Sequence, residues 1–161
     1  MTKNTTLYLD DLQVGQRFTS ETYTIHGSRI KEYAAEFDPQ PFHLDDAAAE
    51  ASVFRGLAAS GWHTAAVTMR LLVGSVPLAG GIVDAGGEIS WPQPTRPGDT
   101  LHVESEILDI RLSHSKPDRG IVTLRGTTFN QNSEAVYLLT AKLVVPTRAK
   151  NSLGKLAAHR A

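Results

Sequence analysis

The chain has 161 residues, of which 41% are hydrophobic and 20% are charged, with a formal net charge of −1 and no cysteine. This size and composition predict one globular domain with its own core. The balanced charge argues against nucleic acid or an anionic membrane as a partner, and the lack of cysteine excludes disulfides and thiolate chemistry.

The sequence also shows no pattern typical of a targeting segment, a membrane span or a metal site. Residues 1–11 are polar, and no uncharged run approaches ~18 residues, so we expect neither a signal peptide nor a membrane span. The histidines are scattered without the close spacing of metal ligands, and we expect no metal. Together with the lack of cysteine, these features lead us to expect a cytoplasmic protein.

The first half of the chain has helical patterns after a short extended start. Residues 12–26 predict a turn followed by a weak strand. Residues 28–37 predict a helix, because Ser28 is a good N-cap and apolar side chains then recur every three to four positions. A second, short helix is expected over residues 47–51.

Residues 37–45, between these helices, place a carboxylate, Asp38, five positions before an imidazole, His43. Pro39 and Pro41 disfavour a helical backbone in the residues before them, so we expect a stiff, non-helical loop. Such a loop could hold a water molecule between the two groups for proton transfer. On spacing alone, a structural role is commoner for such a pair. Asp38 would then end one helix, and His43 would cap the next turn or fill the edge of the core. The two prolines favour the functional interpretation.

Residues 61–76 predict the longest helix, with apolar side chains nearly all round, which is typical of a helix buried inside its domain. Ser60 is an ordinary N-cap, and Gly61 is an ordinary residue at a helix entrance. The functional alternative is that the unpaired N–H groups and positive dipole at this end stabilise an oxygen that gains charge. Glycine would let a ligand approach the Gly61 N–H closely.

Three large ring side chains near this helix start or after it receive structural interpretations. His63 is expected to be a satisfied core histidine or part of a pocket wall rather than a base. Trp62 and Trp91 are expected in the core more than as platforms for a ligand.

The rest of the chain has strand patterns. Four strand segments are expected: 82–91, 101–112, 121–130 and 135–145. The apolar phase of the second flips at Leu108, which indicates a bulge. Helices followed by consecutive antiparallel strands predict an α+β domain, with a long helix wrapped by a curved sheet. We expect this domain to span residues 1–146 and residues 147–161 to form a basic tail.

Three segments, in order, resemble the signature of the MaoC-like dehydratases, the (R)-specific enoyl-CoA hydratase group. Residues 33–49 are similar to the family's Asp-x-Asn-Pro-x-His pattern followed by a small residue. Residues 56–61 are similar to its segment ending in His-Gly, and residues 89–99 to its strand followed by Pro-x-x-x-Gly-Asp. The resemblance covers about residues 12–145, and three motifs in order are far more specific than one.

The chain departs from the family pattern at three positions. Phe37 stands where the family usually has glycine, Gln40 where it has asparagine, and Ser60 where it has histidine. The acid and the histidine themselves, Asp38 and His43, are intact. These differences bear on substrate choice more than on reaction type.

The resemblance implies a hot-dog fold and a homodimer or higher homo-oligomer, with an acyl-CoA bound near the subunit interface. It implies reversible syn addition of water to a trans-2-enoyl-CoA to give an (R)-3-hydroxyacyl-CoA, without metal or prosthetic group, CoA being only part of the substrate. Asp38 and His43 would be catalytic and hold one water, and the Gly61 N–H would bind the thioester oxygen. Further contacts to substrate are expected at the helix start: Ala59, Ser60 and Trp62.

Two other functions fit the same fold. A hot-dog acyl-CoA thioesterase attacks the thioester carbon, commonly with a carboxylate on the central helix, and residues 61–78 contain no Asp or Glu. A non-catalytic acyl-CoA-binding protein would bind an enoyl-CoA without turnover, and the three departures from the family pattern keep this alternative open.

Overall fold

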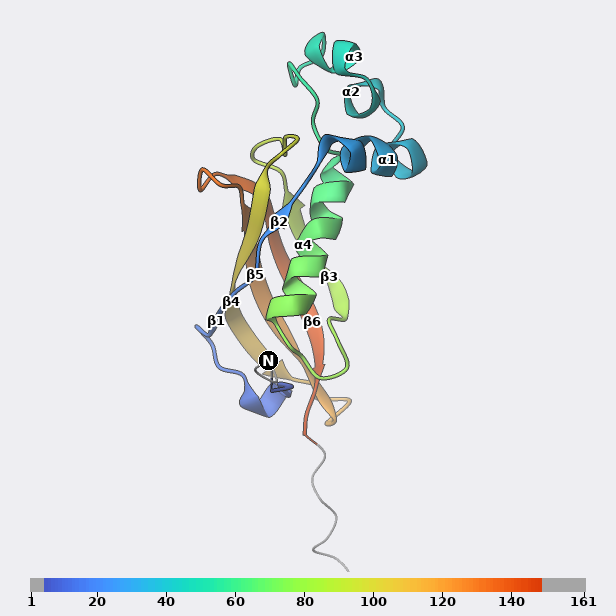
Figure 1. The fold of residues 1–161 in the computed structure, drawn as a ribbon. Helices are drawn as coiled ribbons and strands as arrows, with labels where there is room; N and C mark the ends of the chain where they lie inside the picture. Colours follow the sequence, from blue (N-terminus) through green and yellow to red (C-terminus); the bar gives the residue numbers. More distant parts are fainter. Residues whose placement is uncertain (1–4, 149–161) are drawn as a thin grey trace, which may run out of the picture.

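A curved antiparallel sheet wrapped around one long helix forms the body of the protein in the computed structural model, which describes residues 5–148 (Figure 1). The strands of this part are β1 (Arg17–Thr19), β2 (Tyr23–Thr24), β3 (Asp84–Ser90), β4 (Thr100–Leu112), β5 (Arg119–Phe129) and β6 (Ala135–Pro146). They pair antiparallel in the order β1-β4-β5-β6-β3, and β2 also pairs with β4. The helices are η1 (Leu9–Asp11), α1 (Gly27–Phe37), α2 (Pro41–Leu44), α3 (Asp46–Glu50) and α4 (Gly61–Ser75). This is the predicted α+β hot-dog architecture.

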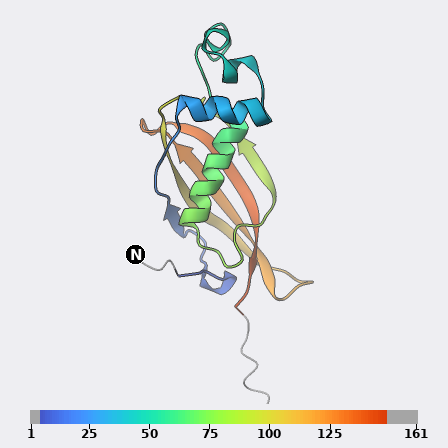
Figure 2. The same cartoon turned by 45° about the vertical axis from the view of Figure 1, so that its right-hand side comes forward.

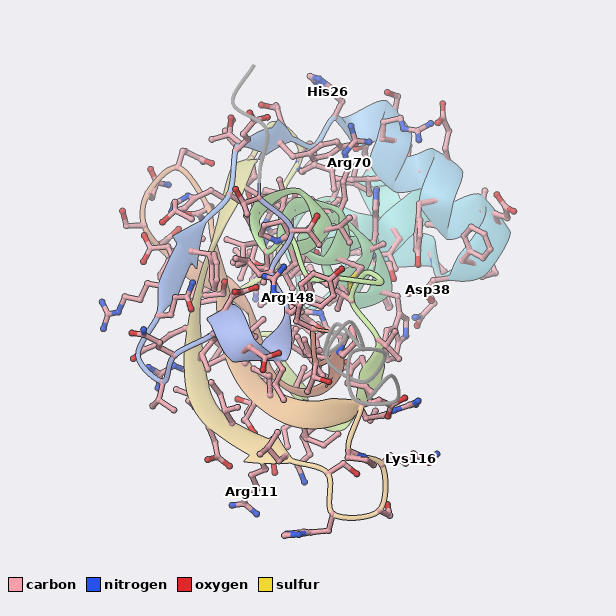
Figure 3. All side chains as sticks on the ribbon, turned by 90° about the horizontal axis from the view of Figure 1, so that it is seen from below. His26, Asp38, Arg70, Arg111, Lys116 and Arg148 are labelled. Atoms are coloured by element: carbon pink, nitrogen blue, oxygen red, sulfur yellow. The ribbon has the colours of Figure 1, made fainter. Side chains whose placement is uncertain are left out.

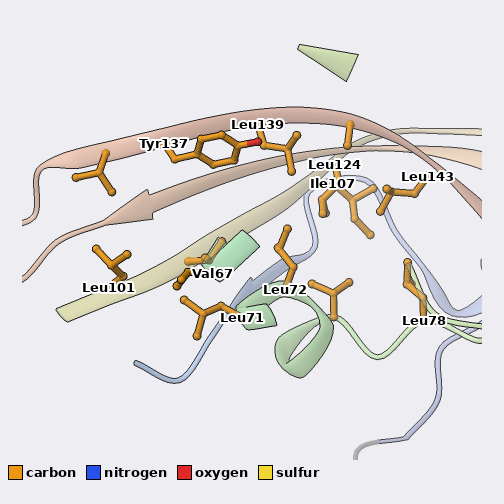
Figure 4. Close-up of a cluster of buried hydrophobic side chains, with 14 of the residues drawn as sticks. Val67, Leu71, Leu72, Leu78, Leu101, Ile107, Leu124, Tyr137, Leu139 and Leu143 are labelled. Atoms are coloured by element: carbon orange, nitrogen blue, oxygen red, sulfur yellow. The ribbon is translucent and has the colours of Figure 1, made fainter. Parts of the chain in front are cut away.

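The core lies between α4 and the concave face of the sheet (Figures 2 and 4). Alternate residues of β4, β5 and β6 are buried, as expected for a sheet with one face covered. The helix meets them with Val67, Leu71 and Leu72. On β6 the buried positions are those that the apolar pattern predicted: Tyr137, Leu139, Ala141, Leu143 and Val145.

Only one face of α4 is buried, which corrects the expectation of a helix covered nearly all round. The buried face comprises His63, Thr64, Val67, Thr68, Leu71 and Leu72. On the opposite face Trp62 and Val73 are 58% and 57% exposed. Apolar side chains occur on both sides of the helix, but the sheet covers one of them. The outer face of α4 is therefore an open apolar surface in a single subunit.

The bulge predicted in the long strand is present. The pairing of β4 with β5 shifts register between Ile107 and Asp109, so Leu108 is the extra residue. Ile107 is buried before the bulge, and Ile110 still packs against the core after it. The bulge bends one continuous strand around α4, as the change of apolar phase indicated.

The helix α1 begins two positions earlier than the predicted Ser28 cap implies. His26 occupies the N-cap position of α1 without a side-chain cap, and Ser28 lies inside the helix, so the predicted Ser28 cap was wrong. The Ile25 backbone N–H donates to Asp99 and its carbonyl accepts from Gly98. Because Ile25 is held on both sides by this turn, the chain leaves the sheet there and α1 starts at once.

The segment that carries the acid and the histidine is helical at its second half. Residues 38–40 are the extended loop that the prolines predict, but Pro41–Leu44 form α2, so His43 lies on a helical turn. Pro41 occupies the first turn of α2, where its fixed φ suits a helix and its missing N–H is not needed. The expectation of a non-helical loop over the whole segment was therefore wrong.

The two ends of the described chain meet below the sheet. The Arg148 backbone N–H donates to Asp10. The Arg148 guanidinium pairs with Asp11 and lies 4.6 Å from the centre of the Tyr8 ring. Figure 3 shows Arg148 next to η1. The predicted tail lies, from residue 149 onward, outside the described residues. Of the helices within residues 5–148, none has the length and apolar character needed to cross a bilayer.

Candidate functional site

A cavity of about 510 Å³ opens where α2, the start of α4 and residues 91–95 meet. Asp38 and His43 line it, as do Ala59, Gly61 and Trp62. The structure therefore brings together five of the six site residues that the sequence singled out. Ser60, the sixth, is fully buried behind the lining.

Asp38 and His43 face each other in this cavity. Asp38 Oδ2 lies 3.4 Å from His43 Nε2, and the two side chains are 17% and 5% exposed. The other ring nitrogen of His43, Nδ1, lies 2.6 Å from the carbonyl oxygen of Ala58. A carbonyl can only accept, so Nδ1 carries the proton and donates it there.

This tautomer decides what the pair can bind. With Nδ1 protonated, Nε2 of the neutral imidazole is an acceptor, and the Asp38 carboxylate opposite is also an acceptor. Two acceptors cannot share a hydrogen directly, but a water molecule can donate one hydrogen to each. The geometry is therefore suited to a water whose oxygen lone pairs point away from both groups, toward a ligand.

The surroundings of Asp38 favour its ionised form. Burial opposes the charge and is the largest single influence, but hydrogen bonding from Ser60 and Gln40 and the nearby His43 together lower the pKa of Asp38 below its ordinary value. Gln40 Nε2 donates to Asp38 Oδ1 at 2.6 Å. Ser60 therefore acts behind the site, on the acid, rather than as a lining residue.

The start of α4 has the arrangement that the sequence predicted and one feature that it did not reveal. The Ser60 hydroxyl accepts the Trp62 N–H at 3.2 Å, and among the described residues no acceptor takes the Gly61 N–H. The indole of Trp91 donates to the Gly61 carbonyl at 2.8 Å. A Cβ at position 61 would lie 2.9 Å from this ring, so the packing of Trp91 requires glycine here.

The mouth of the cavity is aromatic. Trp62 and Trp91 pack edge to face at 5.4 Å and are 58% and 40% exposed. They line the cavity rather than the core, which corrects the sequence interpretation. Phe42 and Phe54 contact each other at 5.1 Å on the side of His43.

An arginine fixes the loop that carries Phe54. The Arg96 guanidinium donates to the carbonyls of Phe54 at 2.5 Å, Gly56 at 2.9 Å and Leu57 at 3.3 Å. Arg55 and Gly56 have positive φ angles of 50° and 143°, so the chain turns sharply within this grip. Sequence reasoning missed both Arg96 and Phe54, because their contact joins positions that no periodic pattern links.

His63 lies outside this cavity. Its ring stacks on Tyr33 at 4.4 Å, and burial, followed by the charge of Arg29, lowers the pKa of the imidazole. Its Nδ1 is buried without a partner among the described residues. It is a core histidine, as predicted, but an unsatisfied one.

Comparison with known proteins identifies the family of this fold. Residues 11–128 match the model of the MaoC like domain. The crystal structure of a MaoC-like dehydratase from Rhodospirillum rubrum superimposes with a TM-score of 0.88 at 59% identity, over 89% of this chain and 99% of that one. The R-hydratase PhaJ1 from Pseudomonas aeruginosa gives a TM-score of 0.72 at 27% identity, over 89% and 88% of the two chains. The uncharacterized protein YdeM of Bacillus subtilis is 31% identical over 132 residues, which are 80% of this chain and 92% of that protein.

Proposed function

This chain belongs to the family of MaoC-like domains, and from that premise we propose that it is an acyl-CoA hydratase that adds water to a trans-2-enoyl-CoA and gives, reversibly, an (R)-3-hydroxyacyl-CoA. The observation that carries this proposal is the pair of acceptors, Asp38 Oδ2 and His43 Nε2, 3.4 Å apart in a cavity. Similarity to an R-hydratase at 27% identity supports the same class of reaction.

In the proposed reaction the water donates one hydrogen to His43 Nε2 and the other to Asp38. The water oxygen attacks C3 of the enoyl thioester while the Asp38 carboxylate takes a proton from it. Electron density moves through C2 to the thioester oxygen, and the enolate then receives at C2 the proton that Asp38 holds. The water hydroxyl and the proton come from one face of the substrate, so the addition is syn.

Two features of the protein would stabilise this sequence. The lowered pKa of Asp38 keeps it a carboxylate, ready to accept the proton. Gly61 lines the same cavity at the start of α4, and its N–H, which has no acceptor among the described residues, would donate to the oxygen that gains charge. The proposed chemistry uses side chains, a backbone N–H and water, and CoA takes part only as the carrier of the acyl group.

We also propose that the protein works as a homodimer or higher homo-oligomer. The outer face of α4 exposes Trp62 and Val73, and β3 is exposed along its whole length at the edge of the sheet. An edge strand with free backbone groups and an adjacent apolar face are suited to pairing with a second copy. Light scattering of the purified protein tests this: a mass of one chain at micromolar concentration would contradict it.

The reaction is tested by the loss of enoyl-thioester absorbance on a panel of trans-2-enoyl-CoAs, with Asp38→Asn as the inactive variant. Asp45→Asn, an exposed acid on the same segment, is the matched control. Hydration that is abolished in the first variant and kept in the second supports the proposal. Full activity of a folded Asp38→Asn protein contradicts it.

A parallel assay for free thiol separates the two alternatives. Release of CoA thiol without hydration would identify a thioesterase. Binding of an enoyl-CoA with neither reaction would identify a non-catalytic binding protein.

A further inference from the structure

Two threonines form a polar spot in the deep part of the cavity. Thr64, one turn into α4, and Thr95 are each 2% exposed, yet both line the cavity. The tryptophans at the mouth are about half exposed, so the buried threonines lie at the opposite, inner side. The Thr64 hydroxyl donates to the Thr95 hydroxyl oxygen at 2.9 Å.

One hydrogen of this pair has no acceptor. Thr64 Oγ1 also lies 3.5 Å from the Ser60 carbonyl oxygen, beyond the usual range of an O–H···O hydrogen bond, so its hydrogen goes to Thr95 at 2.9 Å and the Thr95 oxygen is the acceptor of that bond. Among the described residues, nothing accepts the hydroxyl hydrogen of Thr95 in turn. The Thr95 hydroxyl therefore has a hydrogen to donate to a molecule in the cavity. A hydrocarbon chain that displaced solvent from it would leave this donor buried and unpaired, at a free-energy cost that an acceptor on the bound molecule would avoid.

The charge around the cavity limits what that acceptor can be. Its lining, within the described residues, contains no Lys or Arg, and its one carboxylate is Asp38, whose lowered pKa favours the ionised form. A carboxylate on the substrate would therefore enter without a cation to pair with and close to a like charge. A neutral oxygen, as in an ether or a carbonyl, would accept from Thr95 without that cost.

We infer that Thr95 is a specificity-determining residue, and that the acyl group preferred by this site carries a neutral hydrogen-bond acceptor rather than a plain hydrocarbon chain or a carboxylate. The inference rests on the proposed function for the class of ligand, an acyl-CoA. It concerns the acyl chain beyond the reacting carbons, and it adds a role for Thr95 that the Asp38–His43 pair does not supply.

Calorimetric binding of saturated acyl-CoAs tests the inference without requiring turnover. Hexanoyl-CoA and heptanoyl-CoA are compared with analogues in which one methylene beyond C3 is replaced by an ether oxygen, the position being moved along the chain. At least one ether should bind about three- to tenfold more tightly than its hydrocarbon counterpart, as expected for one neutral hydrogen bond. Thr95→Val should remove this preference, and Thr95→Ser should keep it.

Thr68→Val is the matched control. Thr68 is a buried threonine on α4, the helix that carries Thr64, but it does not line the cavity. The substitution should leave the ratio of the two affinities unchanged. Equal binding of ethers and hydrocarbons by the wild-type protein, or a preference that survives in Thr95→Val, overturns the inference. Tighter binding of the carboxylated analogue glutaryl-CoA than of the ether analogues overturns it as well.

The outcome is separable from that of the proposed reaction. If hydration is observed but the ether preference is absent, the hydratase proposal stands and the role of Thr95 is wrong. If the ether preference depends on Thr95 but no hydration occurs, the cavity binds such acyl groups in a protein that does not catalyse the reaction.

Discussion

The sheet and the helical segment α1–α3 differ in almost every physical respect. Strands β4, β5 and β6 are long, fully paired along their common edges, and bury every second side chain against α4. The helices α1–α3 are short, project beyond one end of the sheet (Figure 1), and bury few residues. Yet the short helical segment supplies Asp38 and His43. The part of the molecule that forms most of the core and the part that carries the proposed catalytic residues are therefore different.

The two regions meet on α4. Its later turns pack Leu71 and Leu72 into the core, while its first residue, Gly61, lines the cavity beside the acid and the histidine. Because one face of α4 packs into the core, the N–H of Gly61 is held in place, and the segment before the helix brings Asp38 and His43 to the same cavity. This division leads to different expected effects for substitutions in the two regions.

The largest expected effect is on stability, from the sheet. Ile107→Ala removes a side chain that is 1% exposed in the core of β4 and should lower the free energy of unfolding by about 2–5 kcal/mol. Activity per folded molecule should change little, because Ile107 does not line the cavity. Urea unfolding measures the first quantity and hydration kinetics the second. Leu112→Ala, on the same strand but 67% exposed, is the control and should cost less than about 0.5 kcal/mol.

The reverse pattern is expected for the helical segment. His43→Gln should lower kcat/KM for hydration on the order of 100-fold, because an amide oxygen can accept a hydrogen bond from the water but cannot share its proton as an imidazole does. Its stability should fall by only about 1 kcal/mol, the value of one hydrogen bond, that to Ala58. If urea unfolding showed a loss as large as that of Ile107→Ala, chemistry and stability would not be separated as the fold suggests.

An intermediate effect is expected at the loop that Arg96 holds. Arg96→Lys keeps the charge but replaces two separate guanidinium nitrogens, one donating to Phe54 and the other toward Gly56 and Leu57, by a single ammonium, so Phe54 should be less firmly placed beside His43. We expect kcat/KM to fall about tenfold, in line with the ~1.5–3 kcal/mol of hydrogen bonds from a charged group. Arg125→Lys, an exposed arginine on β5, is the control. An unchanged kcat/KM in Arg96→Lys would show that Phe54 is held by packing alone.

Sequence reasoning succeeded where a periodic pattern or a continuous motif decides the structure. The alternation along residues 135–145 predicted β6 and its buried face, and the change of phase at Leu108 predicted the bulge. Asp38 and His43 were found because they belong to one short motif with fixed spacing. In each case the physical information is local, and the rest of the fold does not alter it.

Sequence reasoning failed where the burial or the contacts of a side chain depend on another element of the fold. Trp62 was expected in the core, but the sheet covers only the other side of α4. Thr95 and Arg96 had no visible role, because their partners, Thr64 and the carbonyls around Phe54, lie more than thirty positions away. Pro41 was interpreted as a helix breaker although it also suits a helix start.

The smallest expected effect tests the electrostatics of the helical segment alone. Gln40→Ala removes the donor to Asp38 Oδ1, one of the influences that lower the pKa of this carboxyl, so the pKa of Asp38 should rise. The acid limb of the pH profile of kcat/KM should move to higher pH. Gln13→Ala, an exposed glutamine away from the cavity, is the control. A profile that stays in place in Gln40→Ala would show that Ser60 and His43 suffice to keep Asp38 ionised.

Gln40→Ala should also change the stability of the protein in a direction that depends on pH. A carboxyl whose pKa is lowered by folding stabilises the native state above its unfolded pKa of about 3.9, and this contribution disappears as the pH falls through the folded pKa. Gln40→Ala brings the two pKa values closer, so it should reduce stability at neutral pH and leave it nearly unchanged below both. Urea unfolding at pH 7 and at successively lower pH, through the acid range, measures the difference. Gln40 is exposed, and its side-chain amide donates to Asp38, so a change of the same size at every pH would mean that the amide acts through packing rather than through the charge on Asp38.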